Sequence, residues 1–546
     1  MKYDELFKTT ESRKRMHPDM DNDESNEKEH VGEDERIARL VDSAESLKLD
    51  LASVKKMALR FEKACRLNQQ QRSKFLNEPE RWVESEADLD SEIKQLTVLA
   101  GAPELYPDII SLGFGDSVLS LLSHENTDIA NSALELLSSL TDQETVDTET
   151  PEATTGLETL LKYLADNAVD LIVQNMSRLD EDTVEDDRRG VFCSLNLIES
   201  ILSVEASSST SSIVCAAILP FLLQRIRVKS RDSNLSNRVY SSEILSILLS
   251  ASQANRLMFL KQATDHITGM DMMLRVLAAY KKKDPKEIDE LEFISNCFDS
   301  LCTLLSEEEA KLEFLHAEGI ELMLLMERKI SRVYAIKVLD FAISGSNDLA
   351  NRFIEAGGLK RLFPIFLGQG IQRLSSTYDK EYRQEKDDEH TISIILSLFK
   401  SALAKEHLDR LFAKFLENQG EKTERLIVCF RVYYLRVGIL EARFNLLDPE
   451  TRNTDVEYLE RLDAGLYTLQ MISVIIAYLY SADPYSANVS EDGKFPLRES
   501  IKSSLQNHGS SLEECAGVLN EYQNNLESSP SQEAVKNVIE KFLQKK

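Results

Sequence analysis

Apolar residues recur every third or fourth position along most of the chain, which is the spacing of one face of an α-helix. Between residues 35 and 77 this pattern is carried first by Ile37, Leu40, Val41, Ala44, Leu47 and Leu51, then by Ala58, Phe61, Ala64, Cys65 and Leu67. Pro79 interrupts the pattern, and a second helical segment begins near Trp82. The pattern predicts a helical N-terminal region that covers whatever follows it.

A compound unit recurs from about residue 92 to residue 480. Each copy has an apolar stretch that ends in glycine, a short apolar helix, a polar gap and a longer amphipathic helix. Two copies read FLHAEGIELMLLM-ERKIS-RVYAIKVLDFAISGS and FIEAGGLKRLFPIF followed, after a charged insertion, by EHTISIILSLFKSAL. Gly319 and Gly358 hold the same place in these copies, 39 residues apart, near the ~40–47 residues of armadillo and HEAT repeats. The glycines are expected to make the sharp turn between the two short helices.

No single copy can bury its own apolar face, so stacking of the copies is the physical solution. The sequence therefore predicts an all-α solenoid of the armadillo/HEAT type with helical caps at both ends. The predicted divisions are a disordered acidic tail at 1–35, an N-terminal cap at 36–91, repeats at 92–480 and a C-terminal cap at 481–546. Polar insertions such as 143–156 and 369–390 are expected to be loops between helices.

The charge of the chain favours one class of partner over another. The formal net charge is -29 and the sequence pI is near 4.8. An acidic body repels the phosphate backbone, so direct nucleic-acid binding by the main fold is disfavoured and basic protein partners are favoured. The basic runs 225–229 and 281–283 lie at predicted helix ends, where they complement the helix dipole.

Residue usage favours a reducing, intracellular compartment. The seven cysteines form no CxxC pair, and most lie in apolar helical stretches. The first residues, MKYDELFKTT, contain no apolar segment typical of a secretory signal. The longest apolar stretch, 466–480, is shorter than the ~20 residues of a membrane span. No membrane association is expected.

The chain shows no constellation of catalytic residues. Gly113-Phe114-Gly115 follows no strand and lacks the remaining features of a dinucleotide site. The eight histidines are scattered over tails, loops and helix ends. We therefore expect no enzymatic activity, no metal and no cofactor.

A binding surface is the remaining candidate for function. The long third helix of each repeat lines the concave face of an armadillo solenoid. The polar positions of these helices include Asn131, Glu135, Asp299 and Asp340. They predict a concave acidic face that binds a Lys/Arg-rich segment. Taken one by one, these residues also suit ordinary solvent-facing positions. A basic cluster of Arg13, Lys14 and Arg15 in the acidic tail predicts a nuclear-import signal.

Several segments together resemble one family, the armadillo-repeat, spliceosome-associated beta-catenin-like proteins. The segments are PERWVESEADLD (79–90), HENTDIANSALELLSSLTD (124–142), DLIVQNMSRLDE (170–181), FDSLCTLL (298–305), EGIELMLLMERKISRVYAIKVLDFAI (318–343) and ERLDAGLYTLQ (460–470). The resemblance extends from about residue 35 to the C-terminus.

This resemblance implies a nuclear scaffold associated with the spliceosome through the Prp-nineteen complex. It also implies binding to basic, nuclear-localisation-type segments of splicing factors, and self-association as a homodimer. Two alternatives stay open: a nuclear transport adaptor of the karyopherin type and a cytoplasmic adhesion or signalling scaffold. The adaptor is disfavoured because its ladder of Trp and Asn is missing. The only Trp is Trp82, and the matching Asn positions carry Leu136, Ile247, Thr303 and Phe341.

Overall fold

A computed structural model shows the fold. It describes residues 49–142, 146, 148, 150–203, 208–227, 235–264, 267–285, 287–326, 329–369, 384–401, 403–446, 454–482, 497–526 and 530–546. The predicted tail at 1–35, with Arg13, Lys14 and Arg15, lies outside these residues.

The described chain is helical apart from one antiparallel pair of two-residue strands, β1 (Ala263–Thr264) and β2 (Ile267–Thr268). The prediction of an all-α fold is confirmed. One stack of helices runs through the molecule, and each member contacts the next. These inner helices are α6 (Thr127–Thr141), α9 (Glu185–Ser203), α11 (Leu235–Ala251), α14 (Ile288–Leu304), α17 (Lys329–Ile343), α21 (Gln384–Lys400) and α25 (Leu466–Ser481).

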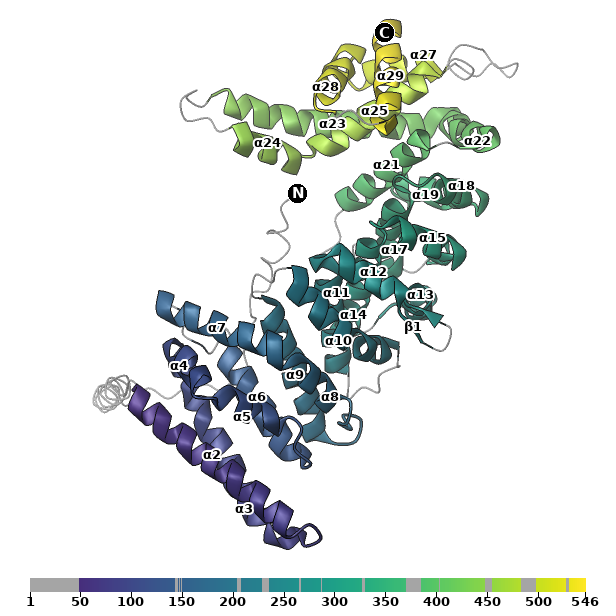
Figure 1. Cartoon of the computed structure of the whole chain (residues 1–546). Helices are drawn as coiled ribbons and strands as arrows, with labels where there is room; N and C mark the ends of the chain where they lie inside the picture. Colours follow the sequence, from purple (N-terminus) through teal and green to yellow (C-terminus); the bar gives the residue numbers. More distant parts are fainter. Residues whose placement is uncertain are drawn as a thin grey trace, which may run out of the picture.

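A second set of helices, most of them shorter, covers the other side of this stack. They are α4 (Tyr106–Ser111), α5 (Phe114–Leu121), α7 (Pro151–Asn167), α8 (Val169–Met176), α10 (Ser208–Arg227), α12 (Gln253–Lys261), α13 (Gly269–Ala278), α15 (Glu308–His316), α16 (Gly319–Leu324), α18 (Asn347–Glu355), α19 (Gly358–Phe366) and α22 (Lys405–Leu416). The helices follow an arc from one end of the chain to the other, with α15, α18 and α22 along its convex side (Figure 1).

Additional helices close the two ends of the arc. α2 (Leu51–Lys74) packs on α3 (Val83–Gln95) at the N-terminal end. At the other end are α23 (Glu421–Phe444), α24 (Thr454–Asp463), α27 (Leu497–Asn507), α28 (Leu512–Asn524) and α29 (Pro530–Lys545). The last three of these helices pack against α25 (Figure 1).

One continuous apolar core follows the stack from α2 to α29. α11 illustrates the arrangement, because Ile244, Leu245, Leu248 and Leu249 are all buried between neighbouring helices. α25 is buried over almost its whole length, which explains the long apolar stretch in the sequence. In the described residues no single helix is long and apolar enough to cross a membrane; only the bent pair Asp455–Asp463 and Leu466–Ser481 passes that test, when taken together.

The repeated glycines have a different role from the predicted one. The left-handed turn falls one residue earlier, at Glu318 (φ 57°) and Gly357 (φ 86°). Gly319 and Gly358 begin α16 and α19, and a Cβ on either would lie 2.4 Å from the ring of Phe314 or Phe353. The prediction that these glycines make the turn is therefore wrong: they are required because the phenylalanine of the preceding helix packs directly on the backbone.

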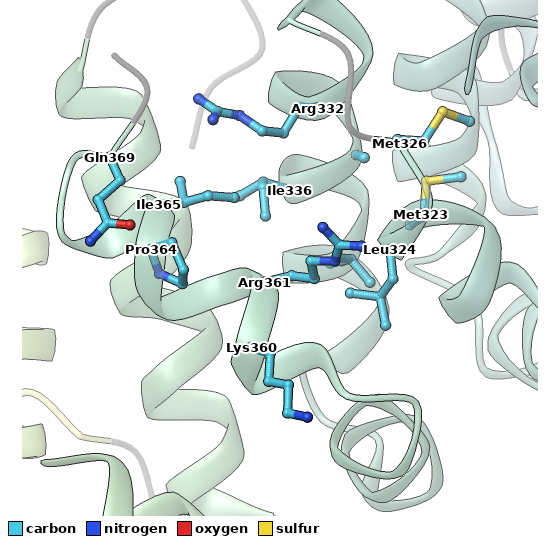
Figure 2. A pocket seen from close by; sticks show the side chains of 12 residues that line it. Met323, Leu324, Met326, Arg332, Ile336, Lys360, Arg361, Pro364, Ile365 and Gln369 are labelled. Carbon is cyan, nitrogen blue, oxygen red and sulfur yellow. The ribbon is translucent and has the colours of Figure 1, made fainter. Parts of the chain in front are cut away.

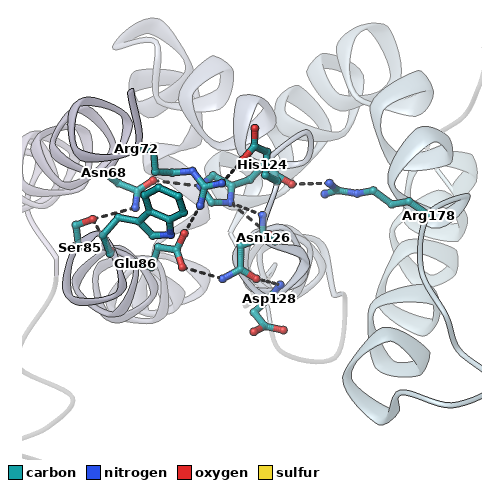
Figure 3. A network of polar contacts seen from close by, with 10 residues as sticks. Asn68, Arg72, Ser85, Glu86, His124, Asn126, Asp128 and Arg178 are labelled. Atoms are coloured by element: carbon teal, nitrogen blue, oxygen red, sulfur yellow. Dashed lines mark hydrogen bonds and ion pairs between the residues drawn. The ribbon is translucent and has the colours of Figure 1, made fainter. Parts of the chain in front are cut away.

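A polar network joins the N-terminal helices to the first repeat (Figure 3). Asn68 on α2 donates from Nδ2 to Ser85 Oγ at 3.1 Å, and its Oδ1 lies 3.1 Å from His124 Nε2. Arg72 pairs with Glu86 and Glu125. Burial lowers the pKa of His124, and its backbone contact with Asn126 and the charges of Glu86 and Glu125 only partly oppose this effect. The half-buried His124 therefore serves as a structural link.

Candidate protein-binding surface on the inner helices

Polar side chains connect successive inner helices along the stack. Ser138 on α6 donates to Asn196 Oδ1 on α9 at 2.8 Å. Tyr240 on α11 donates to Glu199 Oε2 on α9 at 2.5 Å. Asn296 on α14 donates to Ser242 Oγ on α11 at 3.2 Å. These contacts fix the inner helices side by side, so that their remaining exposed side chains form one surface, the inner surface.

Asn131 and Glu135 both lie between α6 and α9. Asn131 is only 5% exposed, and its Nδ2 donates to the carbonyl of Asp186 at 3.3 Å. A Cβ on Gly190 would lie 2.3 Å from Asn131 Oδ1, so α9 approaches this side chain closely. Asn131 thus fills a contact between helices. Glu135, which is partly exposed, forms an ion pair with Arg189 at 2.8 Å.

Asp299 and Asp340 lie on the inner surface at the next repeats. Asp299 pairs with Lys337 of α17 at 2.6 Å. Burial acts to lower the pKa of Lys337, but the charge and hydrogen bond of Asp299, together with Cys302 and Tyr334, outweigh it and the net shift is upward. Asp340 lies 2.9 Å from His390 Nδ1 of α21. Both carboxylates therefore lie on inner helices and have intramolecular partners; their part in a concave face that binds another protein stays a prediction.

A group of three carboxylates lies across three consecutive inner helices, and of these Glu199 has an intramolecular partner, because it accepts a hydrogen bond from Tyr240. Glu243 of α11 lies between Glu199 of α9 and Glu292 of α14. Burial raises the pKa of Glu243, and the charges of Glu199 and Glu292 raise it further. In the described part of the chain, Glu243 and Glu292 form no ion pair. We call these residues the acidic triad.

A second acidic group lies nearer the C-terminal end, where α17, α21 and α25 meet. Burial raises the pKa of Tyr467, and the charges of Asp340 and Glu389 raise it further, so these groups lie close together. Tyr467 is 47% exposed and Phe341 is 40% exposed. Exposed aromatic rings beside carboxylates are suited to hold a Lys or Arg side chain, because the ring face attracts a cation.

The sequence did not reveal the acidic triad. Its members occupy different positions along their helices: late in α9, central in α11 and early in α14. Their proximity arises from the stagger of neighbouring helices, and no fixed sequence spacing reports that stagger. The available signal was only that each is a Glu on the polar face of a consecutive third helix.

The described residues provide neither a cluster of metal ligands nor a reactive thiol. No group of three or more His, Cys, Asp or Glu in the described ranges is placed to hold a metal ion. The cysteines are free, and all but Cys65 are buried. Burial raises the pKa of the Cys429 thiol to about 12, which keeps the sulfur protonated and unreactive.

Comparison with known proteins identifies the family. The family profile described as "Catenin-beta-like, Arm-motif containing nuclear" matches residues 35–520. Beta-catenin-like protein 1 of Homo sapiens is 34% identical over 514 residues, covering 91% of this chain and 85% of that protein. The Schizosaccharomyces pombe homolog is 34% identical over 485 residues, covering 86% and 80%.

Among solved structures, SYS-1 aligns with 89% of this chain and 85% of its own, with a TM-score of 0.45 and 10% sequence identity. The family is settled by the sequence matches, which extend over nine-tenths of the chain. The chain belongs to the beta-catenin-like protein 1 family of armadillo-motif nuclear proteins.

Proposed function

We propose that this protein is a non-catalytic nuclear scaffold of the splicing machinery that binds basic, nuclear-localisation-type segments of splicing factors on its inner surface. The observation that carries the proposal is the acidic triad. Three carboxylates lie close together there: burial raises the pKa of Glu243, and repulsion by Glu199 and Glu292 raises it further. A Lys or Arg from a partner would relieve that repulsion, so this part of the inner surface favours the binding of a cation.

The second acidic group extends the proposed contact along the stack. Neighbouring helices pack ~8–10 Å apart, so the three steps from α11 to α21 span roughly 30 Å. An extended chain covers about 3.3 Å per residue, so roughly nine residues would bridge the two groups. We therefore expect the preferred ligand to carry two basic clusters separated by about nine residues, one for each acidic group.

A transport adaptor is the alternative, and the residue types on the inner helices disfavour it. Trp82 lies in the connection before α3, outside the inner helices. Carboxylates, rather than a Trp and Asn ladder, are then the contacts for a basic segment. The nuclear description of the family supports a nuclear site of action.

Binding of a labelled synthetic peptide with two Lys/Arg clusters about nine residues apart tests the site. Removing two charges of the triad in the double variant Glu243→Gln/Glu292→Gln should weaken binding about tenfold at low salt, or ~1.4 kcal/mol. The matched control is Glu309→Gln/Glu406→Gln, which removes two exposed charges from the outer helices α15 and α22. Equal losses in both double variants would mean that only net charge matters and would refute the site.

The splicing assignment has its own test. The protein would be used to recover partners from nuclear extract at low and moderate salt, and the partners identified by mass spectrometry. Spliceosomal proteins with basic segments should be recovered by the wild type and lost with the triad variant. Recovery of nuclear-pore or adhesion proteins alone would contradict the assignment.

A further inference from the structure

Unlike the acidic inner surface, a pocket between α16, α17 and α19 combines an apolar lining with cationic side chains. It has a volume of about 320 Å³. Its apolar lining comes from all three helices and includes Met323, Met326, Ile336, Leu339 and Ile365. These side chains are almost completely buried, so the pocket is a gap in the packed core that opens at the surface.

Three cationic side chains surround this apolar lining. Figure 2 shows Arg332 of α17 at one end, Lys360 of α19 at the other end and Arg361 between them. The Nε and one terminal nitrogen of Arg332 are buried and form no hydrogen bond, and the ion pair of this guanidinium with Asp387 is long, at 3.8 Å. A buried guanidinium nitrogen without an acceptor is costly, which indicates that an acceptor is supplied from outside.

The charge of the pocket is opposite to that of the molecule. Among the residues that the structure describes, its lining contains no Asp or Glu, although the chain carries a net charge of -29. Glu321 lies in the adjoining surface pocket, which shares Lys360 and Arg361, but this carboxylate pairs with Arg352. Lys360 forms no ion pair in the described part of the chain, and two buried nitrogens of Arg332 lack a hydrogen-bond acceptor there, so both side chains can receive carboxylates of a ligand.

We propose that this pocket binds an acidic peptide segment of a partner protein, in which one or two large apolar side chains lie between carboxylates. The apolar side chains would enter between Met323, Met326 and Ile365. The flanking carboxylates would pair with Arg332 on one side and Lys360 on the other. Methionine side chains adapt to ligands of different shape, which suits a short linear segment.

The spacing of the cations favours a peptide over other amphipathic anions. A fatty acid has one charged group and would leave one end of the pocket unmatched. A peptide supplies an anion on each side of an apolar residue, as the arrangement in Figure 2 requires. The exposed Leu325, in the adjoining surface pocket, provides further apolar contact for the same segment.

The test uses the full-length chain and a fluorescein-labelled peptide with a Leu-Phe pair between two pairs of aspartates, followed by fluorescence anisotropy. Binding should weaken at least tenfold in Lys360→Glu and recover in Lys360→Arg. The matched control, Lys405→Glu, changes an exposed lysine on α22 and should bind like the wild type. Replacing the aspartates by asparagines, or Leu-Phe by Ser-Ser, should abolish binding of the peptide.

Several results would overturn the proposal. One is that Lys360→Glu binds the peptide as tightly as the wild type does. Another is that the asparagine peptide binds as tightly as the aspartate peptide. A chain without residues 1–35 that binds the peptide at least tenfold tighter would assign the pocket to the acidic tail of the chain itself. Because the basic peptide that tests the acidic triad should bind Lys360→Glu unchanged, failure of either proposal is distinguishable from failure of the other.

Discussion

At the scale of single residues, the repeat is maintained by a close contact between a ring and the backbone. Phe314 precedes Gly319 by five residues, and Phe353 precedes Gly358 by the same distance. The glycine allows the phenylalanine of the first short helix to lie on the start of the second. The sequence pattern identified the right glycines, but it could not distinguish a turn from a close approach, because both require a missing Cβ.

Gly319→Ala should therefore destabilise the protein, because the added Cβ would lie 2.4 Å from the ring of Phe314. Overpacking of this kind costs ~1–3 kcal/mol in the free energy of unfolding. The control is Gly438→Ala within α23, where a Cβ meets nothing within 4 Å and a gain of ~0.5–1 kcal/mol is expected. Chemical denaturation of both variants measures the difference, and equal stabilities would contradict the packing role.

Glu243 allows a second prediction at this scale, because its pKa is raised in the folded state. A carboxyl with a raised folded pKa destabilises the folded state once pH rises above its unfolded value of 4.5. Glu243→Gln should therefore have a higher melting temperature than the wild type at pH 7. The gap should close as pH falls toward 4.5. A gap that is independent of pH would show that the pKa of Glu243 is not raised in the folded state.

At the scale of elements, the helices could be predicted and their contacts could not. The three- and four-residue periodicity predicted helices that the structure confirms, among them α14, α17 and α25. The polar partners of these helices come from distant parts of the chain. Asp340 meets His390 across 50 residues, and Asn68 meets His124 across 56. Such pairs depend on the angle and stagger of packing, which hydrophobic periodicity does not encode.

The link between α2 and the first repeat should depend on pH through His124. Its pKa is lowered by burial, so the folded state binds the proton less well than the unfolded state does. The stability gained from the neutral side chain is present above the unfolded pKa of 6.5 and is lost as pH falls below it. His124→Gln should melt below the wild type at pH 7.5, and this difference should shrink by pH 5.5. Thermal melts at both pH values measure it; a constant difference would contradict the role of this histidine.

At the scale of the whole molecule, the C-terminal helices protect the end of the stack. The ring of Tyr480 on α25 lies 5.3 Å from the ring of Phe542 on α29, and Cys515 of α28 is also buried against this end. Removing residues 497–546 should expose the apolar face of α25, so that the truncated chain aggregates or self-associates. Size-exclusion chromatography with light scattering would detect this. A monomeric, stable truncated chain would show that these helices are not needed to complete the core.

The net charge of -29 is also a property of the whole molecule, and the proposed binding of basic segments depends on where that charge lies. The sequence predicted an acidic concave face, and the structure places Glu135, Asp299 and Asp340 on the inner helices with cationic or histidine partners. Glu243 and Glu292 of the acidic triad, by contrast, form no ion pair in the described part of the chain. Composition could indicate the sign of the surface, but only the packed helices show which carboxylates remain available.

The most direct test of the central claim is photo-crosslinking of the basic two-cluster peptide, with a photoreactive residue beside each cluster, to the full-length protein. We predict crosslinks to α9, α11 and α14 from one cluster and to α17, α21 and α25 from the other. Raising the salt concentration should weaken both sets of crosslinks, because exposed ion pairs are screened. Crosslinks confined to the outer helices α15, α18 and α22 would contradict the account.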